Sequence, residues 1–124
     1  MDFHAYGKRI PLAYTMWAKK ELLKVFGDGE SIAKAFAVAD ESELASNMAK
    51  IGSVLSKAYS MRRKALVQLT GEEDDSFPIE EETMFALLDR DLTIQLVGAV
   101  TKTVAEANKT SVEVAPEKKD GAMQ

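Results

Sequence analysis

The sequence predicts a mainly α-helical fold: an N-terminal β-hairpin packed on a bundle of about five helices, followed by a flexible polar tail. Polar and apolar residues alternate on both sides of a Gly-Lys pair within residues 2–14. Beyond them, apolar residues recur at helical spacing, and this periodicity stops at Asn108. We therefore expect one domain over residues 1–107, with the hairpin at 2–14 and the tail over 108–124.

Composition restricts the classes of function. The 124 residues include 16 Lys and Arg against 20 Asp and Glu, a net charge of −4. Nucleic-acid binding driven by bulk charge needs a basic face and is disfavoured. The chain has no cysteine, which excludes disulfides and thiolate metal sites. No apolar run approaches the ~20 residues of a membrane span, and the first residues do not resemble a signal peptide, so we expect a cytoplasmic protein.

The hairpin is predicted to turn at Gly7-Lys8, with glycine at the first position of a type II′ turn. This turn pairs Ala5 with Ile10. An apolar face then comprises Phe3, Ala5, Ile10 and Leu12. The opposite, wet face comprises His4, Tyr6, Arg9 and Pro11. We expect the apolar face to cover helices, because a two-stranded ribbon is marginal alone.

Capping residues predict the first two helices. Thr15 suits the N-cap of a helix that stops at Gly27, and Asp28 or Gly29 opens a short second helix. Helical spacing places the apolar residues of the first helix on one side: Met16, Ala18, Leu22, Leu23, Val25 and Phe26.

A long third helix is predicted from Asp40 to about Leu69, because Asp40 is followed three places on by Glu43. Gly52 lies inside this helix. It indicates either a tolerated loss of helix stability or a site where another helix crosses closely. One apolar seam comprises Leu44, Met48, Ile51, Leu55, Tyr59, Leu66 and Leu69. A second seam comprises Val54, Ala58, Met61 and Ala65, so we expect more than one helical neighbour.

After the acidic loop Glu72–Asp75, Pro78 suits the first turn of a fourth helix, with Glu80–Glu82 at its positive end. Asp91 is expected to cap the fifth helix. The acidic loop lacks EF-hand spacing and is interpreted as solvated charge. The single histidine, His4, has no partner for a zinc site or a nucleophilic relay. We therefore predict no enzymatic activity, no catalytic, cofactor-binding or metal-binding residues, and no cofactor.

Two groups of side chains are candidate partner-binding residues. Trp17 lies on the charged side of the first helix with Lys20 and Lys24, where it either anchors a partner or is covered by the hairpin. The second group, on the long helix, comprises Lys57, Arg62, Arg63 and Lys64. It either pairs with the acidic loop or docks an acidic partner.

The opening of the chain resembles that of tailed-bacteriophage tail assembly chaperones. The residues that carry this resemblance run from Tyr6 to Leu12, then Thr15-Met16 and Glu21 to Gly27: a strand, a Gly-Lys turn, a Leu-bearing strand, and a helix ending at Phe-Gly. The order of elements that follows is also similar, over about residues 2–107.

The resemblance implies a non-enzymatic protein of the bacterial cytoplasm that binds and solubilises the tape measure protein during tail morphogenesis and is absent from the mature virion. It also implies self-association, and recruitment of tail tube protein through a longer, frameshifted form. Neither a nucleic acid nor a membrane is an expected partner. Two other functions stay open at this point: another phage morphogenesis protein, such as a head–tail connection adaptor, and a helical regulator that binds nucleic acid.

Overall fold

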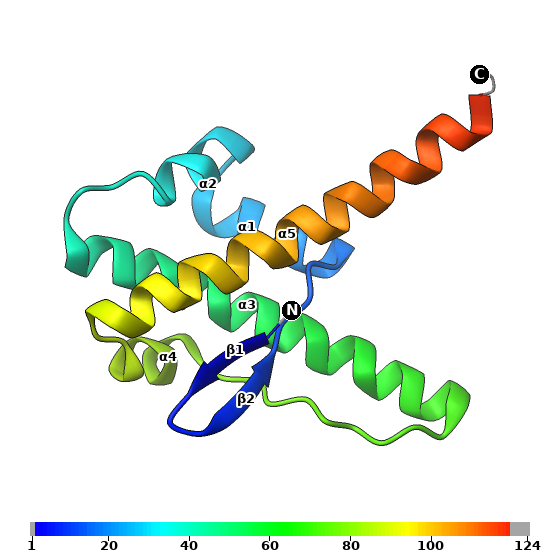
Figure 1. The fold of residues 1–124 in the computed structure, drawn as a ribbon, viewed down its shortest axis with the longest axis horizontal. Coiled ribbons are helices and arrows are strands. Elements are labelled where there is room, and N and C mark those ends of the chain that lie inside the picture. Colours follow the sequence, from blue (N-terminus) through cyan, green and yellow to red (C-terminus); the bar gives the residue numbers. More distant parts are fainter. Residues whose placement is uncertain (1, 120–124) are drawn as a thin grey trace.

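The computed structural model describes the backbone of residues 2–119 and the side chains of residues 2–108. A two-stranded hairpin precedes five helices in this part of the chain (Figure 1). The elements are β1 (Asp2–Ala5), β2 (Lys8–Pro11), α1 (Met16–Phe26), α2 (Gly29–Ala35), α3 (Glu41–Thr70), α4 (Glu81–Leu87) and α5 (Arg90–Lys119). The predicted fold class, mainly helical with an N-terminal β-hairpin, is confirmed.

Helix α3 is the centre of the fold, because it contacts the other four helices and β2. Helix α5 crosses over it (Figure 1). A methyl group added to Gly52 would lie 3.2 Å from Met84 Cε and 3.3 Å from Leu96 Cδ1. Gly52 therefore marks a close approach of α4 and α5 to α3, the second of the two alternatives that the sequence left open.

The hairpin turns one residue earlier than predicted. Tyr6 and Gly7 both have positive φ, 53° and 75°, as a type I′ turn requires. Phe3 therefore pairs with Ile10, and Ala5 with Lys8, in an antiparallel ladder. Moving the turn by one residue shifts the pairing by two, so every side chain keeps its face. The predicted apolar face is accordingly buried although the predicted pairing is wrong.

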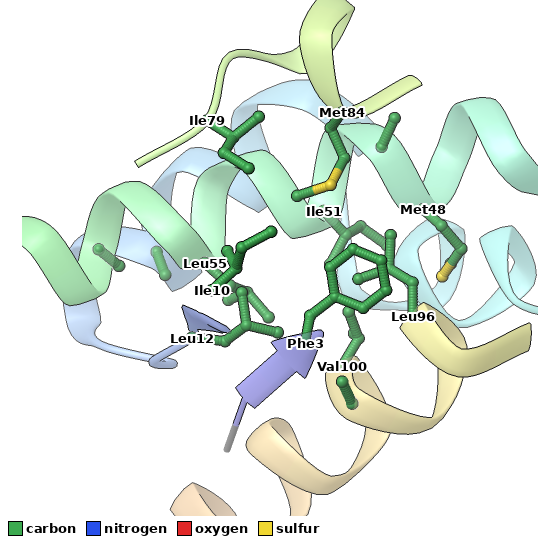
Figure 2. Close-up of a cluster of buried hydrophobic side chains, with 14 of the residues drawn as sticks. Phe3, Ile10, Leu12, Met48, Ile51, Leu55, Ile79, Met84, Leu96 and Val100 are labelled. Carbon is green, nitrogen blue, oxygen red and sulfur yellow. The ribbon is translucent and has the colours of Figure 1, made fainter. Parts of the chain in front are cut away.

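The core is formed where the hairpin meets α3, α4 and α5. Phe3 projects from β1 toward Ile51 of α3 and Leu96 of α5 (Figure 2). Met84 of α4 enters the same cluster and is fully buried. The connection after β2 is fixed to α3 as well, because the N–H of Ala13 donates to the carbonyl of Leu55 at 3.1 Å. The hairpin thus covers the helices, as expected.

Local caps explain where the first three helices begin. Thr15 Oγ1 accepts from the N–H of Ala18 at 3.1 Å, and Asp28 Oδ1 accepts from that of Ser31 at 2.7 Å. Asp40 Oδ1 accepts from the N–H groups of the residues two and three places on. Helix α1 ends at Gly27, whose φ of 98° suits glycine. These predicted caps are confirmed.

Two later boundaries differ from the prediction. Helix α5 begins at Arg90, and Asp89 caps it instead of Asp91, because Asp89 Oδ1 accepts from the N–H of Leu92 at 2.8 Å. Helix α4 begins only at Glu81, so Pro78 lies outside its first turn. The intervening chain stays extended because the buried Ile79 bonds to serines of α3 through its backbone.

Predictions of exposure were also wrong in part. In α1 the buried residues are Ala18 and Leu22, whereas Met16, Leu23 and Val25 are exposed, because neighbours cover only one side of this helix. Pro11 is buried, although it shares the outer face of β2 with Arg9. Arg9 donates a hydrogen bond to Asp75 in the segment after α3. This segment therefore approaches the hairpin face that was predicted to be exposed to solvent.

The predicted seams of α3 reach the core only as far as Ser60. Beyond it Met61 is exposed, and Leu69 is 81% exposed. The last turns of α3 extend away from the other helices (Figure 1). The helix ends at Gly71, which is left-handed with φ 78°. Apolar spacing at the end of this helix therefore does not indicate burial.

Residues 71–80, here called the strap, run back along α3 to the start of α4 (Figure 1). Serines of α3 bind its backbone. Ser53 Oγ donates to the carbonyl of Ile79 at 2.7 Å, and Ser56 Oγ accepts from the N–H of Ile79 at 3.0 Å. Farther along, Ser76 Oγ donates to Ser60 Oγ at 3.1 Å. The three α3 serines are buried, and two of them satisfy both backbone groups of Ile79, as a neighbouring strand would.

The expected tail coincides with the second half of α5. The helix continues past Asn108 to Lys119 and projects from the body of the molecule (Figure 1). Residues 120–124 of the predicted tail lie outside the described residues.

Candidate functional site: an apolar groove beside helix α5

An open apolar groove of about 710 Å³ runs between α5 and the pair α1–α2. We call it the groove and define it by Leu22 of α1, Ile32 and Phe36 of α2, and Val97, Val100 and Val104 of α5. Ile32, Phe36, Val97 and Val104 pack against the core but stay only half-buried. These side chains therefore offer apolar surface that the fold does not fully cover.

Local sequence explains how α5 lines the groove. Val97, Thr101, Val104 and Asn108 follow one another at steps of four, three and four, so they share one face of the helix. Thr103, on the neighbouring buried face, satisfies its hydroxyl by donating to the carbonyl of Ala99 at 2.7 Å. The lining stretch from 97 to 108 is about 16 Å long, at 1.5 Å per residue.

Helix α2 forms the opposite wall. It is short and begins at the Asp28 cap, whose carboxyl pKa is lowered by the hydrogen bonds from Ser31. Among residues 29–35 only Ala35 is buried, and Ile32 and the capping residue Phe36 are half-buried against the core. Asn47 of α3 fixes the end of this wall, because its Nδ2 donates to the carbonyl of Ala35 at 3.2 Å.

The groove is electrically neutral. Its lining contains no charged side chain; the polar side chains in it are those of Tyr14, Thr101 and Asn108. Burial raises the pKa of the Tyr14 phenol above its ordinary value, so this group stays neutral as well. Such a surface suits the apolar face of a partner.

A separate polar cluster lies at the strap. Asp75 accepts from Tyr59 Oη at 2.7 Å and from Arg9 Nη1 at 2.9 Å, and Arg63 Nε lies 3.2 Å from it. The bond from Arg9 is the main cause that lowers the pKa of Asp75 to about 2. Arg63 also donates to Glu72 and to the carbonyl of Glu73. The alternative in which the basic cluster pairs with the acidic loop is confirmed for Arg63.

The predicted partner-binding residues lie on two different helices. Trp17 is half-buried and packs against the core, whereas Lys20 is exposed beside it on α1. Lys24 donates to Glu21 at 3.2 Å. On α3, Arg62 is exposed and Arg63 holds the strap. A role for any of the five in partner binding stays a prediction.

Sequence reasoning missed the groove, although part of its signal is visible in the chain. Val97, Val100 and Val104 recur at helical spacing, as expected for the fifth helix, but nothing in one sequence shows that α2 stands beside them. Among the described residues no group of His, Cys, Asp or Glu could hold a metal ion. In the same part of the chain, none of the helices has the length and apolarity to cross a membrane.

No protein-family model, no curated protein and no solved structure matches this chain.

Proposed function

We propose that this chain is a tail assembly chaperone of a tailed bacteriophage, which binds and solubilises the tape measure protein in the bacterial cytoplasm and is absent from the mature virion. The resemblance of residues 6–27 to that family motivates the proposal. The groove is the observation that carries it, because a chaperone of a helical client needs uncovered apolar surface and no reaction centre.

The form of the groove fits a helical client. An amphipathic helix docks by placing apolar residues at positions i, i+3, i+4 and i+7 into a hydrophobic channel. The ~16 Å of α5 that lines the groove corresponds to about three turns of such a helix. Because the lining is uncharged, binding depends on the spacing of apolar residues in the client helix and not on its charges. The groove can therefore accept many similar segments of one long client. Repetition along the client then makes weak single contacts effective.

The test is co-expression with the long helical protein encoded next to this gene in its phage or prophage. We expect the client to become soluble and to be captured by the wild-type chain. Ala33 and Ala105 are exposed and line the groove, so the double variant Ala33→Glu/Ala105→Glu places two charges in it without removing a core residue. This variant should lose capture at least tenfold.

Ala86→Glu is the matched control, because Ala86 is an exposed helical alanine outside the groove. It should behave as the wild type. Unchanged client solubility with the wild-type chain would contradict the proposal. Mass spectrometry of purified particles tests the second part: detection of this chain in the virion would favour a head–tail adaptor instead.

A further inference from the structure

Helix α1 presents an exposed surface, here called the ridge, that the fold leaves uncovered. Met16 and Leu23 are two helical turns apart on one face, and Met16 is 75% exposed. Lys19 flanks this pair on one side and Lys20 and Lys24 on the other. Lys24 is bonded to Glu21, whereas Lys19 and Lys20 form no ion pair within the described residues. The ridge is therefore an exposed apolar strip flanked by lysines, of which Lys19 and Lys20 are unpaired among the described residues.

A concave surface of opposite charge lies elsewhere on the molecule, where α3 and α5 begin and α4 ends. We call this hollow of about 490 Å³ the notch. Its apolar floor comprises Leu44, Phe85, Leu88 and Ile94, of which Ile94 is 63% exposed and Phe85 47% exposed. Its charged residues are two carboxylates and one guanidinium, from Glu41, Asp89 and Arg90.

The single positive charge in the lining of the notch, that of Arg90, is neutralised by an ion pair with Glu41. Arg90 Nη2 lies 2.7 Å from Glu41 Oε2, so this pair is neutral and Asp89 leaves the rim acidic. Asp89 Oδ1 accepts from the N–H of Leu92 but has no cationic partner among the described residues. The notch thus combines an exposed apolar floor with a net negative charge, which is opposite in sign to the charge of the ridge.

We propose that the ridge of one copy docks in the notch of a second copy of this chain. The two surfaces belong to different rigid elements of one folded body, so they cannot meet within one molecule. Docking would cover Met16 and Leu23 with Phe85 and Ile94 and bring Lys19 or Lys20 near Asp89. Because different surfaces pair, the contact is heterologous, and it repeats from copy to copy into a chain or a ring.

The size of the ridge sets the strength of this contact. Helix α1 has 11 residues, and at 1.5 Å per residue it is about 16 Å long. One face of it buries far less than the ~800 Å² per partner of a standard interface. Association is therefore weak and fast, and it depends on concentration. The inference rests on the free chain and does not require the proposed function.

Complementary variants test the pairing. Met16→Asp/Lys20→Glu reverses the ridge, and the new Asp at the first position of α1 suits its positive end, so folding is preserved. Ile94→Lys puts a cation on the notch floor. For the wild type, we expect the sedimentation coefficient to rise with concentration and ¹H–¹⁵N signals of ridge and notch to shift together. Each variant alone should stay monomeric. An equimolar mixture should associate again, because the intact ridge of one variant meets the intact notch of the other and the reversed ridge meets the new lysine.

Two control variants match these changes outside both surfaces. Val25→Asp adds an acid to α1, and Leu69→Lys replaces an exposed apolar residue at the end of α3; both should associate as the wild type does. Circular dichroism verifies that every variant is folded. The proposal is overturned if the wild type stays monomeric with unchanged signals at all concentrations, if either variant associates alone, or if their mixture does not.

Discussion

Arg9 of the hairpin and Asp75 of the strap are joined by a hydrogen bond of 2.9 Å. Arg9 Nε also lies 2.6 Å from Asp2 on the paired strand, so one guanidinium connects both strands to the strap. Tyr59 completes the cluster from α3. The hairpin, α3 and the strap are separate segments of the sequence, and this cluster joins all three around one carboxylate.

The cluster makes stability depend on pH in the acidic range. The pKa of Asp75 falls from 3.8 to about 2 in the folded state. A lowered folded-state pKa stabilises the fold above pH 3.8, and this contribution is lost as the pH falls toward 2. Asp75→Asn should therefore be less stable than the wild type at neutral pH and lose less stability on acidification. Urea unfolding at pH 7 and pH 3 measures both.

Glu73→Gln is the control for this comparison. Glu73 is exposed on the same strap, and its backbone carbonyl, not its carboxylate, accepts from Arg63. Its stability should follow the wild-type pH dependence. Identical pH profiles for Asp75→Asn and the wild type would contradict the stabilising role of the cluster.

The buried backbone N–H of Ile79 has the hydroxyl of Ser56 as its hydrogen-bond acceptor. Ser56→Ala leaves the N–H of Ile79 without its acceptor, which should cost about 1–3 kcal/mol of unfolding free energy. Hydrogen exchange of the Ile79 amide should accelerate as well. Ser46→Ala, at a half-buried site of the same helix outside these contacts, should leave the exchange of this amide unchanged. Unaltered protection of Ile79 in Ser56→Ala would refute the arrangement.

The close approach at Gly52 predicts coupling between two helices. Gly52→Val should destabilise by about 1–3 kcal/mol because it overpacks a full core. Met84 has its Cε nearest to the new side chain, and Met84→Ala alone should cost about 2–5 kcal/mol through its cavity. The double variant should cost less than the sum, since the valine fills part of that cavity. Denaturant unfolding of the four proteins gives the coupling energy; strict additivity would argue against the contact.

The hairpin turn offers a stabilising change. Tyr6 is 76% exposed at a φ of 53°, a conformation that asparagine tolerates better. Tyr6→Asn should raise the unfolding free energy by up to about 1 kcal/mol, because left-handed backbone costs about 1–2 kcal/mol for most residues and less for asparagine. Gly7→Ala, at φ 75°, should lower it. Thermal unfolding distinguishes the two, and a loss of stability in Tyr6→Asn would count against the type I′ turn.

Local signals were readable from the sequence, and contacts between distant segments were not. Thr15, Asp40 and Gly27 act within one turn of their own helix, so their roles follow from neighbouring residues. The turn was misplaced because Gly7-Lys8 has glycine at the first position, as a type II′ turn prefers. In the structure the turn is Tyr6-Gly7, and the non-glycine residue Tyr6 has a positive φ. Asp91 was preferred over Asp89 for a similar reason: both are capping residues, and only tertiary packing decides between them.

The candidate site shows the same division. The valines of α5 could be placed on one face from their spacing, but the wall formed by α2 depends on how two helices dock. The first part of the strap was predicted as an acidic loop, whose pairing with Arg63 was one of two alternatives, whereas the part from Pro78 was wrongly predicted to begin the fourth helix. The contributions of Ser53, Ser56 and Arg9 left no signal, because a serine or an arginine on an exposed pattern is ordinary until a partner from another segment reaches it.

The position of β1 has a consequence for how the chain folds during synthesis. Phe3 and Ile10 are synthesised long before their partners Leu96 and Val100, which belong to helix α5. Until that helix emerges, the hairpin has only part of its contacts, so its apolar face is exposed on the nascent chain. Completion of the core is thus a late, long-range step, which slows folding relative to a bundle of sequential neighbours.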